Sequence, residues 1–305
     1  MNYKGHTRYL KDSTAKLIEK KLSELKSKAS IRNYTNAIDS ICNFSGKDFC
    51  EISKETVEKY LKHLKSTNRT DPYIIARFRM LRSIARYIDG ETGSSLALTA
   101  YSGHEMQVDK LSLTKEDMAE LAAVDTVIGH LKKKGDDQLI AIIGLALECG
   151  LPTGDIIRLK CSDIHLDTDG KPYIKLVDAK ETGSWIREFP LKEATAKRIN
   201  DLVVERGDGK QTDAVFVDKW GAPLTHRAVQ MMLKKAEKEA GIAPESEFTI
   251  QKLNNLAVIG MIQGGADADQ LSGQLGHVST WFSRYKSIAD DLRLSAVGLN
   301  CIRID

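Results

Sequence analysis

The sequence predicts a mainly α-helical protein with a small antiparallel β-sheet, and three patterns carry this prediction. Residues 13 to 92 repeat one motif, in which a capping residue precedes apolar side chains at helical spacing. Residues 164 to 191 instead alternate apolar and polar side chains around turn residues, as paired strands do. Beyond them the helical spacing returns. The sequence therefore indicates two regions of different character.

Residues 1 to 92 are predicted to form a domain of four helices. Ser13, Ser30 and Ser53 each precede an apolar stripe at helical spacing, so we expect them to cap the first three helices. Pro72 suits the first turn of the fourth helix, where its missing N–H costs no hydrogen bond.

The fourth helix carries a stripe of basic side chains. Arg79, Arg82 and Arg86 are three and seven positions apart and share one face, and no acid interrupts the helix between its two ends. A solvated helix face usually mixes charges of both signs, so a face of one sign favours contact with phosphates. Arg32 and Arg77 are further candidates for such contacts.

Residues 93 to 110 are poor in charge and rich in small side chains, which predicts an interdomain linker. Residues 111 to 305 then form the second predicted domain, of mixed α and β structure. Its most apolar stretch, residues 136 to 149, is apolar on almost every side and predicts a central core helix.

The strand-like segment of the second domain predicts a three-stranded antiparallel sheet. Asp169 and Gly170 lie between two alternating runs, which is a strong signal for a hairpin. Residues 184 to 191 can add a third strand. Lys180 is then expected in the loop before that strand.

Composition excludes several classes of protein. The five cysteines are scattered and form no CxxC pair, so neither a disulfide framework nor a zinc site is indicated, and we expect no metal and no cofactor. The sequence has no apolar run of the roughly 18 residues that a membrane span needs, and its first residues do not resemble a secretory signal. We therefore expect a cytoplasmic protein with no membrane partner.

The net charge of +3 conceals an uneven distribution. Residues 1 to 110 hold 20 Lys and Arg against 13 Asp and Glu, so the N-terminal third is the basic part of the chain. A local basic excess favours a polyanionic partner over a neutral one. It does not by itself identify nucleic acid.

Several motifs in order resemble the tyrosine recombinase, or phage integrase, family, over about residues 13 to 300. The resemblance rests on the basic helical domain followed by "GLPTGDIIRLKCSDI", "AKETGSWIREFPL", "GAPLTHRAVQMMLKKAEKEAGI", "FTIQKLNNLAVIGMIQGGADADQLSGQLGHVS" and "FSRYKS". It implies an N-terminal four-helix core-binding (SAM-like) domain and an α+β catalytic domain. Together such domains encircle duplex DNA and clamp it.

The resemblance also implies catalytic roles. Tyr285 matches the nucleophile that attacks a DNA phosphodiester, His277 matches a histidine beside the phosphate, and Lys180 matches the lysine that protonates the leaving hydroxyl. The family surrounds the phosphate with cations because negative charge concentrates on its oxygens in the transition state.

Three other catalytic positions depart from the family pattern. Pro152 stands where the first arginine is expected, and Gln251 and Asn254 replace the histidine and the second arginine of a single motif. Asp155 keeps an acid where the family has one, so the register is sound. Arg158 lies on another face of its helix and is not expected to substitute for the lost arginine.

The lost donors bear on whether the chain can cleave DNA. At about 3 kcal/mol each, three missing transition-state contacts correspond to at most about 9 kcal/mol, or six to seven decades in rate. The sequence therefore favours a double-stranded DNA-binding protein that is catalytically impaired and acts as an accessory or regulatory factor. The alternatives are an active recombinase with a non-standard phosphate site, repaired by Lys252 or by a partner's arginine, and a protein-binding module that has lost DNA.

The resemblance extends to DNA contacts and partners. Positions near DNA in the family correspond here to Lys160, Thr225, His226, Arg227 and Thr249. The C-terminal tail of one family member typically docks on its neighbour, so residues 288 to 305 predict self-association on DNA. An active recombinase paralogue is a further expected partner, and a mobile genetic element the expected context.

Overall fold

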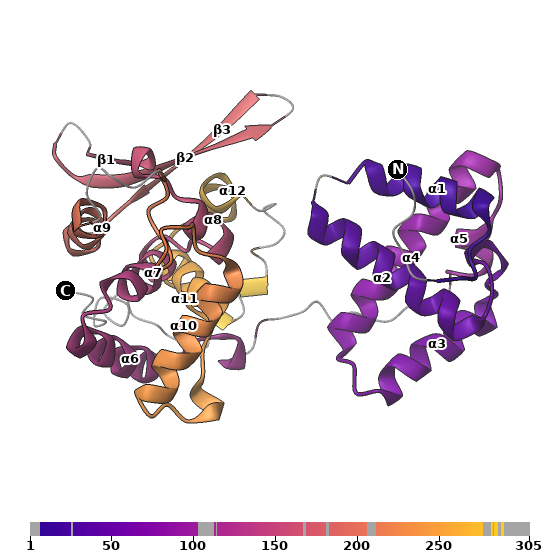
Figure 1. Ribbon diagram of the computed structural model, residues 1–305, viewed down its shortest axis with the longest axis horizontal. Coiled ribbons are helices and arrows are strands. Elements are labelled where there is room, and N and C mark those ends of the chain that lie inside the picture. Colours follow the sequence, from indigo (N-terminus) through magenta and orange to yellow (C-terminus); the bar gives the residue numbers. More distant parts are fainter. Residues whose placement is uncertain are drawn as a thin grey trace. The chain divides into compact units, whose positions relative to one another are not determined.

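The computed structural model describes residues 7–25, 27–102, 113, 115–166, 169–180, 183–205, 212–276, 282, 284–285 and 288–289. The chain divides into two compact units, Met1–Asp109 and Lys110–Asp305. The units contain many helices and one three-stranded antiparallel sheet (Figure 1), so the predicted fold class is confirmed.

The first unit is a small helical bundle whose longest helix, α4, packs against α1, α2, α3 and α5. Its helices share one apolar core, to which Ile38, Leu81 and Ile84 contribute fully buried side chains. The elements are α1 (Asp12–Ser23), α2 (Lys28–Ser45), η1 (Phe49–Glu51), α3 (Lys54–Ser66), α4 (Asp71–Thr92) and α5 (Leu96–Thr99).

Only one of the three predicted serine caps is correct. Ser53 accepts a hydrogen bond from the Thr56 N–H and caps α3 as expected. The prediction for Ser30 is wrong, because Ser27 occupies the cap and accepts the Ser30 N–H at 3.3 Å. The prediction for Ser13 is also wrong, because α1 begins at Asp12 with Lys11 at the N-cap, two residues before the predicted cap.

The structure differs from the predicted linker at residues 93 to 110. Leu96 and Tyr101 are buried in the core of the first unit. The Asp89 carboxylate accepts hydrogen bonds from the N–H groups of Leu96 and Ala97 at 2.6 and 2.7 Å, and from the Ser94 hydroxyl at 2.6 Å. The first part of this segment therefore belongs to the N-terminal unit, because apolar burial and one carboxylate fix it there.

The second unit surrounds the apolar helix α7, which contacts α6, α9 and α11. Every side chain from Leu139 to Leu147 is buried, so the predicted central core helix is confirmed. The helices of this unit are η2 (Lys115–Asp117), α6 (Leu121–Lys134), α7 (Asp137–Glu148), α8 (Thr153–Arg158), η3 (Cys161–Asp163), α9 (Glu193–Glu205), α10 (His226–Glu239), η4 (Pro244–Ser246), α11 (Ile250–Gln263) and α12 (Ala268–Leu275).

The sheet has the order β1-β2-β3, with antiparallel pairing throughout. Gly170 lies between the first two strands with a φ of 78°, a conformation that favours glycine, and the predicted hairpin is confirmed. The strands are β1 (Ile164–Leu166), β2 (Pro172–Lys180) and β3 (Gly183–Pro190). Lys180 was predicted to lie in the loop before the third strand. That prediction is wrong, because Lys180 pairs with Gly183 and is the last residue of β2.

Within the described residues no helix combines the length and apolar character that crossing a membrane requires.

The Asp89 contacts lead to a first prediction. We expect Asp89→Ala to destabilise the first unit by about 1 to 2 kcal/mol, because three donors lose a charged acceptor. Hydrogen exchange of the Leu96 and Ala97 amides should become faster, and the thermal midpoint should fall. Glu58→Ala, which removes an exposed acid of α3, is the matched control. Equal effects in both variants would contradict the stabilising role of the Asp89 hydrogen bonds to Ser94, Leu96 and Ala97.

Candidate active site

Helix α11 carries two of the departures from the family pattern. Thr249 caps this helix and accepts a hydrogen bond from the Lys252 N–H at 3.2 Å. The helix is buried along most of its length and packs against α7. Gln251 is exposed near its start, whereas Asn254 and its neighbour Asn255 are 6% and 5% exposed. The amides of Asn254 and Asn255 therefore need partners inside the protein.

Those partners are neutral groups. Gln251 Nε2 donates to Asn255 Oδ1 at 3.0 Å and to Asn254 Oδ1 at 3.4 Å. Asn255 Nδ2 donates to the backbone carbonyl of Asp117 at 2.9 Å, and Asn254 Nδ2 donates to the carbonyl of Gly150. Amides and backbone carbonyls thus occupy the region where the resemblance implies a histidine and an arginine.

The tyrosine at the nucleophile position joins this network. The Tyr285 hydroxyl donates to Asn255 Oδ1 at 2.9 Å, and its side chain is fully buried. Burial raises the pKa of this phenol well above its ordinary value, and the nearby Arg284 offsets only part of that increase. The phenol is therefore neutral at physiological pH and acts here as a hydrogen-bond donor.

Pro152 lies at the start of α8, close to this network in the chain. It occupies the N-cap with a φ of −68°, and its carbonyl accepts the first helical hydrogen bonds from Asp155 and Ile156. Gly150, two positions earlier, has a φ of 63°, and its carbonyl accepts a hydrogen bond from Asn254 Nδ2. The turn at Gly150 thus connects Pro152 to Asn254, although the two residues are about 100 positions apart in the chain.

A cluster of four charged side chains lies beside α8. Arg187 Nη1 binds Asp155 Oδ2 at 2.7 Å, and Arg187 Nη2 binds Asp178 Oδ2 at 2.7 Å. Arg158 bridges the same two acids, at 3.2 Å to Asp155 and 2.6 Å to Asp178. Both arginines are therefore engaged with carboxylates.

Arg187 is the buried member of this cluster, at 4% exposure. Its guanidinium lies 4.7 Å from the ring centroid of Trp185 and 5.8 Å from that of Phe189. Desolvation lowers its pKa, but Asp155 and Asp178 raise it by more, so Arg187 stays charged. For Asp178, desolvation raises the pKa and the hydrogen bonds of Arg158 and Arg187 lower it by more, so the net shift is downward.

Sequence reasoning missed Arg187 and Asn255, although each left a signal. Arg187 alternates with Trp185 and Phe189 on one face of its strand, which is the pattern of a buried arginine. Asn255 is a second asparagine inside an otherwise apolar helix, which indicates a buried polar contact.

Trp185 also touches the far end of α12. Gly276 ends that helix with a φ of 80°, and a Cβ at this position would overlap the indole ring. The indole therefore lies against backbone directly before the predicted His277. His277 itself lies outside the described residues, as does the side chain of Lys180.

The residues predicted near DNA in this unit are exposed, and they lie at the start of α10, after α8 and, for Thr249, at the start of α11. Thr225 caps α10 and accepts the Ala228 N–H at 3.1 Å, and His226 and Arg227 form its first turn. The His226 ring approaches Gly154 of α8. Lys160 is exposed after α8 and donates its N–H to Asp163 at 2.9 Å.

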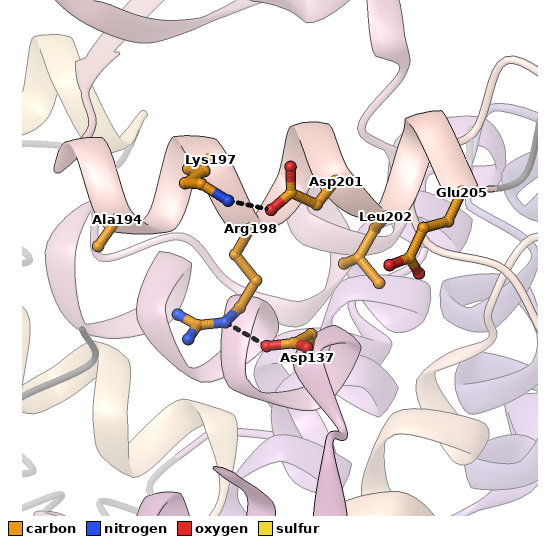
Figure 2. Close-up of a pocket in the computed structure, with 7 residues that line it drawn as sticks. All are labelled: Asp137, Ala194, Lys197, Arg198, Asp201, Leu202 and Glu205. Atoms are coloured by element: carbon orange, nitrogen blue, oxygen red, sulfur yellow. Dashed lines mark hydrogen bonds and ion pairs between the residues drawn. The ribbon is translucent and has the colours of Figure 1, made fainter.

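A surface pocket of this unit lies elsewhere. It measures about 400 Å³ between α7 and α9 and includes Asp137, Lys197, Arg198 and Asp201 (Figure 2). Lys197 pairs with Asp201 and Arg198 with Asp137, each at 2.6 Å. Because these cations are already paired, we assign no catalytic role to this pocket. The described residues also hold no cluster of His, Cys, Asp and Glu suited to a metal ion.

Comparison with known proteins decides the family. Residues 112–289 match the model of the phage integrase family. The chain belongs to the phage integrase family, whose members include the tyrosine recombinases. The resemblance found in the sequence is thus confirmed.

Relatives and solved structures agree with this assignment. Tyrosine recombinase XerC of Natranaerobius thermophilus is 22% identical over 284 residues, covering 88% of this chain and 90% of the relative. The Tn1549 transposon integrase in complex with transposon right end DNA gives a TM-score of 0.66 at 13% identity, covering 92% of this chain and 98% of the other. XerH recombinase bound to its difH substrate gives 0.65 at 14%, covering 95% and 90%. At these identities the structures establish the fold.

The ion cluster leads to a prediction on pH dependence. The folded pKa of Asp178 lies below its ordinary value of 3.8, so its contribution to stability is present above that pH and is lost as the pH falls. We expect Arg187→Met to cost about 3 kcal/mol at neutral pH, because two acids lose a shared buried cation. The loss of stability on acidification should then be smaller in the variant.

Urea unfolding followed by tryptophan fluorescence measures this, because all three tryptophans belong to the second unit. Arg227→Met removes an exposed arginine with no ion pair among the described residues and serves as the control. If both variants keep the acid dependence of the unmodified protein, the cluster does not act as described.

Proposed function

We propose that this chain is a double-stranded DNA-binding tyrosine recombinase homologue that is impaired in strand cleavage and serves as an accessory or regulatory factor. The observation that carries the proposal is the neutral network around Tyr285. Its hydroxyl binds Asn255, and Asn255 in turn binds Gln251 and the Asp117 carbonyl. Strand cleavage by a tyrosine needs fixed cations at this place, and amides stand there instead.

The charge deficit supports impairment quantitatively. Phosphoryl transfer places growing negative charge on the non-bridging oxygens, and catalysis depends on donors already directed at that charge. Gln251 and Asn254 can donate hydrogen bonds to an oxygen but cannot neutralise it, and Pro152 has no side-chain donor at all. Each lost contact corresponds to about two orders of magnitude in rate, with incomplete additivity.

The state of the tyrosine supports the same conclusion. A nucleophilic phenol must lose its proton in the reaction, and burial of Tyr285 opposes this by raising its pKa. Its hydroxyl also donates to Asn255. Attack on a phosphate would require the hydroxyl to leave this partner.

Nearby cations are engaged in other contacts, which argues against a repaired site. Arg158 and Arg187 are bound by Asp155 and Asp178. Lys252, the expected internal replacement, donates from Nζ to the Glu247 carbonyl at 3.2 Å. A cation supplied by a partner protein remains the way in which an active complex would arise.

DNA as the partner is supported by the solved neighbours and by the first unit. The Tn1549 integrase, XerH and lambda integrase structures all contain DNA. In this chain Arg79 and Arg86 are exposed on α4, and neither forms an ion pair within the described residues. Arg32 is exposed on α2, and Arg77 lies over the Tyr73 ring at 5.0 Å. These cations suit phosphate contacts that hold the duplex.

Sequence selectivity is assigned to the second unit. Lys160, His226 and Arg227 present exposed polar groups near the starts of helices, where side chains can reach base edges. Thr225 and Thr249 use their hydroxyls as helix caps, so their contribution to DNA contact is through positioning. Roles of His277 and Lys180 in cleavage are proposed from the family sequence pattern alone.

The proposed setting follows from the family. The protein acts on DNA in the cytoplasm, associated with the nucleoid and with a mobile element. Self-association through the C-terminal tail and cooperation with an active paralogue belong to this proposal, and residues 290 to 305 lie outside the described part of the chain.

DNA binding should depend strongly on salt. We expect alanine at Arg79, Arg82 and Arg86 together to weaken binding to all duplexes and to flatten the slope of log affinity against log salt by about two to three. Fluorescence anisotropy with a labelled duplex measures the slope. Alanine at Lys54, Lys62 and Lys65 of α3 removes equal charge as the control. An unchanged slope in the arginine variant would remove the first unit from the interface.

No covalent protein–DNA adduct should form. A preferred duplex is first selected from a random library, then nicked to make a suicide substrate that traps a phosphotyrosine link. The unmodified chain should give no adduct, and Tyr285→Phe should bind the duplex with affinity unchanged within about twofold. A XerC relative on its own site is the positive control. An adduct that disappears in Tyr285→Phe would overturn impairment in favour of an active recombinase.

A further inference from the structure

A groove on the first unit collects basic side chains from two helices. It measures about 450 Å³ and is lined by Lys21 of α1 and by Arg79, Arg82, Ser83, Arg86 and Tyr87 of α4. No carboxylate lines it. Helices α1 and α4 pack directly against each other, so the groove belongs to the folded core of the unit rather than to a loop. We call it the α1–α4 groove.

Two donors in this groove are buried without a hydrogen-bond acceptor among the described residues. They are Nε of Arg82 and the hydroxyl of Tyr87. A buried donor that lacks an acceptor is costly, and native proteins rarely leave one without a reason. Two such donors lining one cationic groove point to an anionic acceptor that completes both.

The surroundings keep the groove positive. Lys21 Nζ lies 5.1 Å from the ring centroid of Tyr87 and pairs with Glu24 at 2.7 Å, outside the groove lining. Lys20 pairs with Glu91 at 2.6 Å, and its ammonium also donates to the Tyr87 hydroxyl oxygen. Lys20 and Lys21 are therefore held in place by acids, whereas the three arginines that line the groove have no acidic partner within the described residues.

The pocket of Figure 2 shows what an internally neutralised site looks like. It has a similar volume, yet its Lys197 and Arg198 each bind a carboxylate. In the α1–α4 groove only Lys21 pairs with a carboxylate, whereas Arg79, Arg82 and Arg86 have no ion pair among the described residues. Internal ion pairing therefore explains the cations of the Figure 2 pocket but not the arginines of the α1–α4 groove.

We infer that the α1–α4 groove is an organised site for phosphoryl anions with two or more negative charges, and that Arg82 Nε and the Tyr87 hydroxyl donate to them. On DNA this anion is a pair of neighbouring phosphates on one strand. Free inorganic polyphosphate carries the same chemistry. The inference rests on the proposed DNA binding and adds Lys21, Ser83 and Tyr87 to the contacts expected from the arginine stripe.

Charge-conserving variants separate an organised site from diffuse attraction. Arg82→Lys keeps the charge but removes Nε, and Tyr87→Phe removes only a hydroxyl. Each should weaken duplex binding about tenfold, since a directed hydrogen bond to a charged group is lost. Lys62→Arg, a charge-conserving change at an exposed position of α3, should change binding less than twofold. Anisotropy at fixed salt measures the affinities, and thermal midpoints confirm that each variant is folded.

A second arm tests the source of the anion. Inorganic tripolyphosphate should compete with duplex DNA for the unmodified protein, and calorimetry should show that Tyr87→Phe weakens tripolyphosphate binding as well. Unchanged duplex binding in both Arg82→Lys and Tyr87→Phe would overturn the groove while leaving DNA binding intact. Tripolyphosphate binding that depends on Tyr87, with no duplex binding at any salt, would support the groove and overturn the proposed function.

Discussion

The buried guanidinium of Arg187 joins three elements of the second unit, because it binds Asp178 on its own hairpin and Asp155 on α8. Burying a charge in a protein is expensive unless carboxylates and hydrogen bonds surround it, and once surrounded it permits little movement. The start of α8, where Pro152 stands, is thereby fixed relative to the sheet. The positions of the turn at Gly150 and of the α11 amides follow from this anchoring.

The amide network then explains how the site is stable without cations. An arginine buried at position 254 would need a counter-anion, which a phosphate supplies only when DNA is bound. Asn254 instead reaches the Gly150 carbonyl inside the protein, and Asn255 satisfies both the Asp117 carbonyl and the Tyr285 hydroxyl. A neutral site is complete in the absence of DNA, whereas a charged one depends on its ligand. Stability and strand cleavage therefore make opposite demands on these positions.

The sequence predicted what depends on neighbours in the chain. The hairpin at Gly170 and the apolar helix α7 follow from local spacing and turn chemistry, and both were found. Ser30 was predicted as a cap in place of Ser27 because both precede the same apolar stripe, and only the backbone geometry distinguishes them. Arg187 was missed because its partner Asp155 is 32 positions away. Asn255 was missed because its partners come from two distant segments.

The indole of Trp185 touches both the Arg187 guanidinium and the backbone at Gly276. One aromatic ring of the β2–β3 hairpin thus lies against the end of α12. Substitutions at positions 185 and 276 are therefore expected to depend on each other. A larger side chain at position 276 requires a smaller one at 185, and a smaller one at 185 uncovers the arginine. The packing of this ring therefore couples the hairpin to the end of α12.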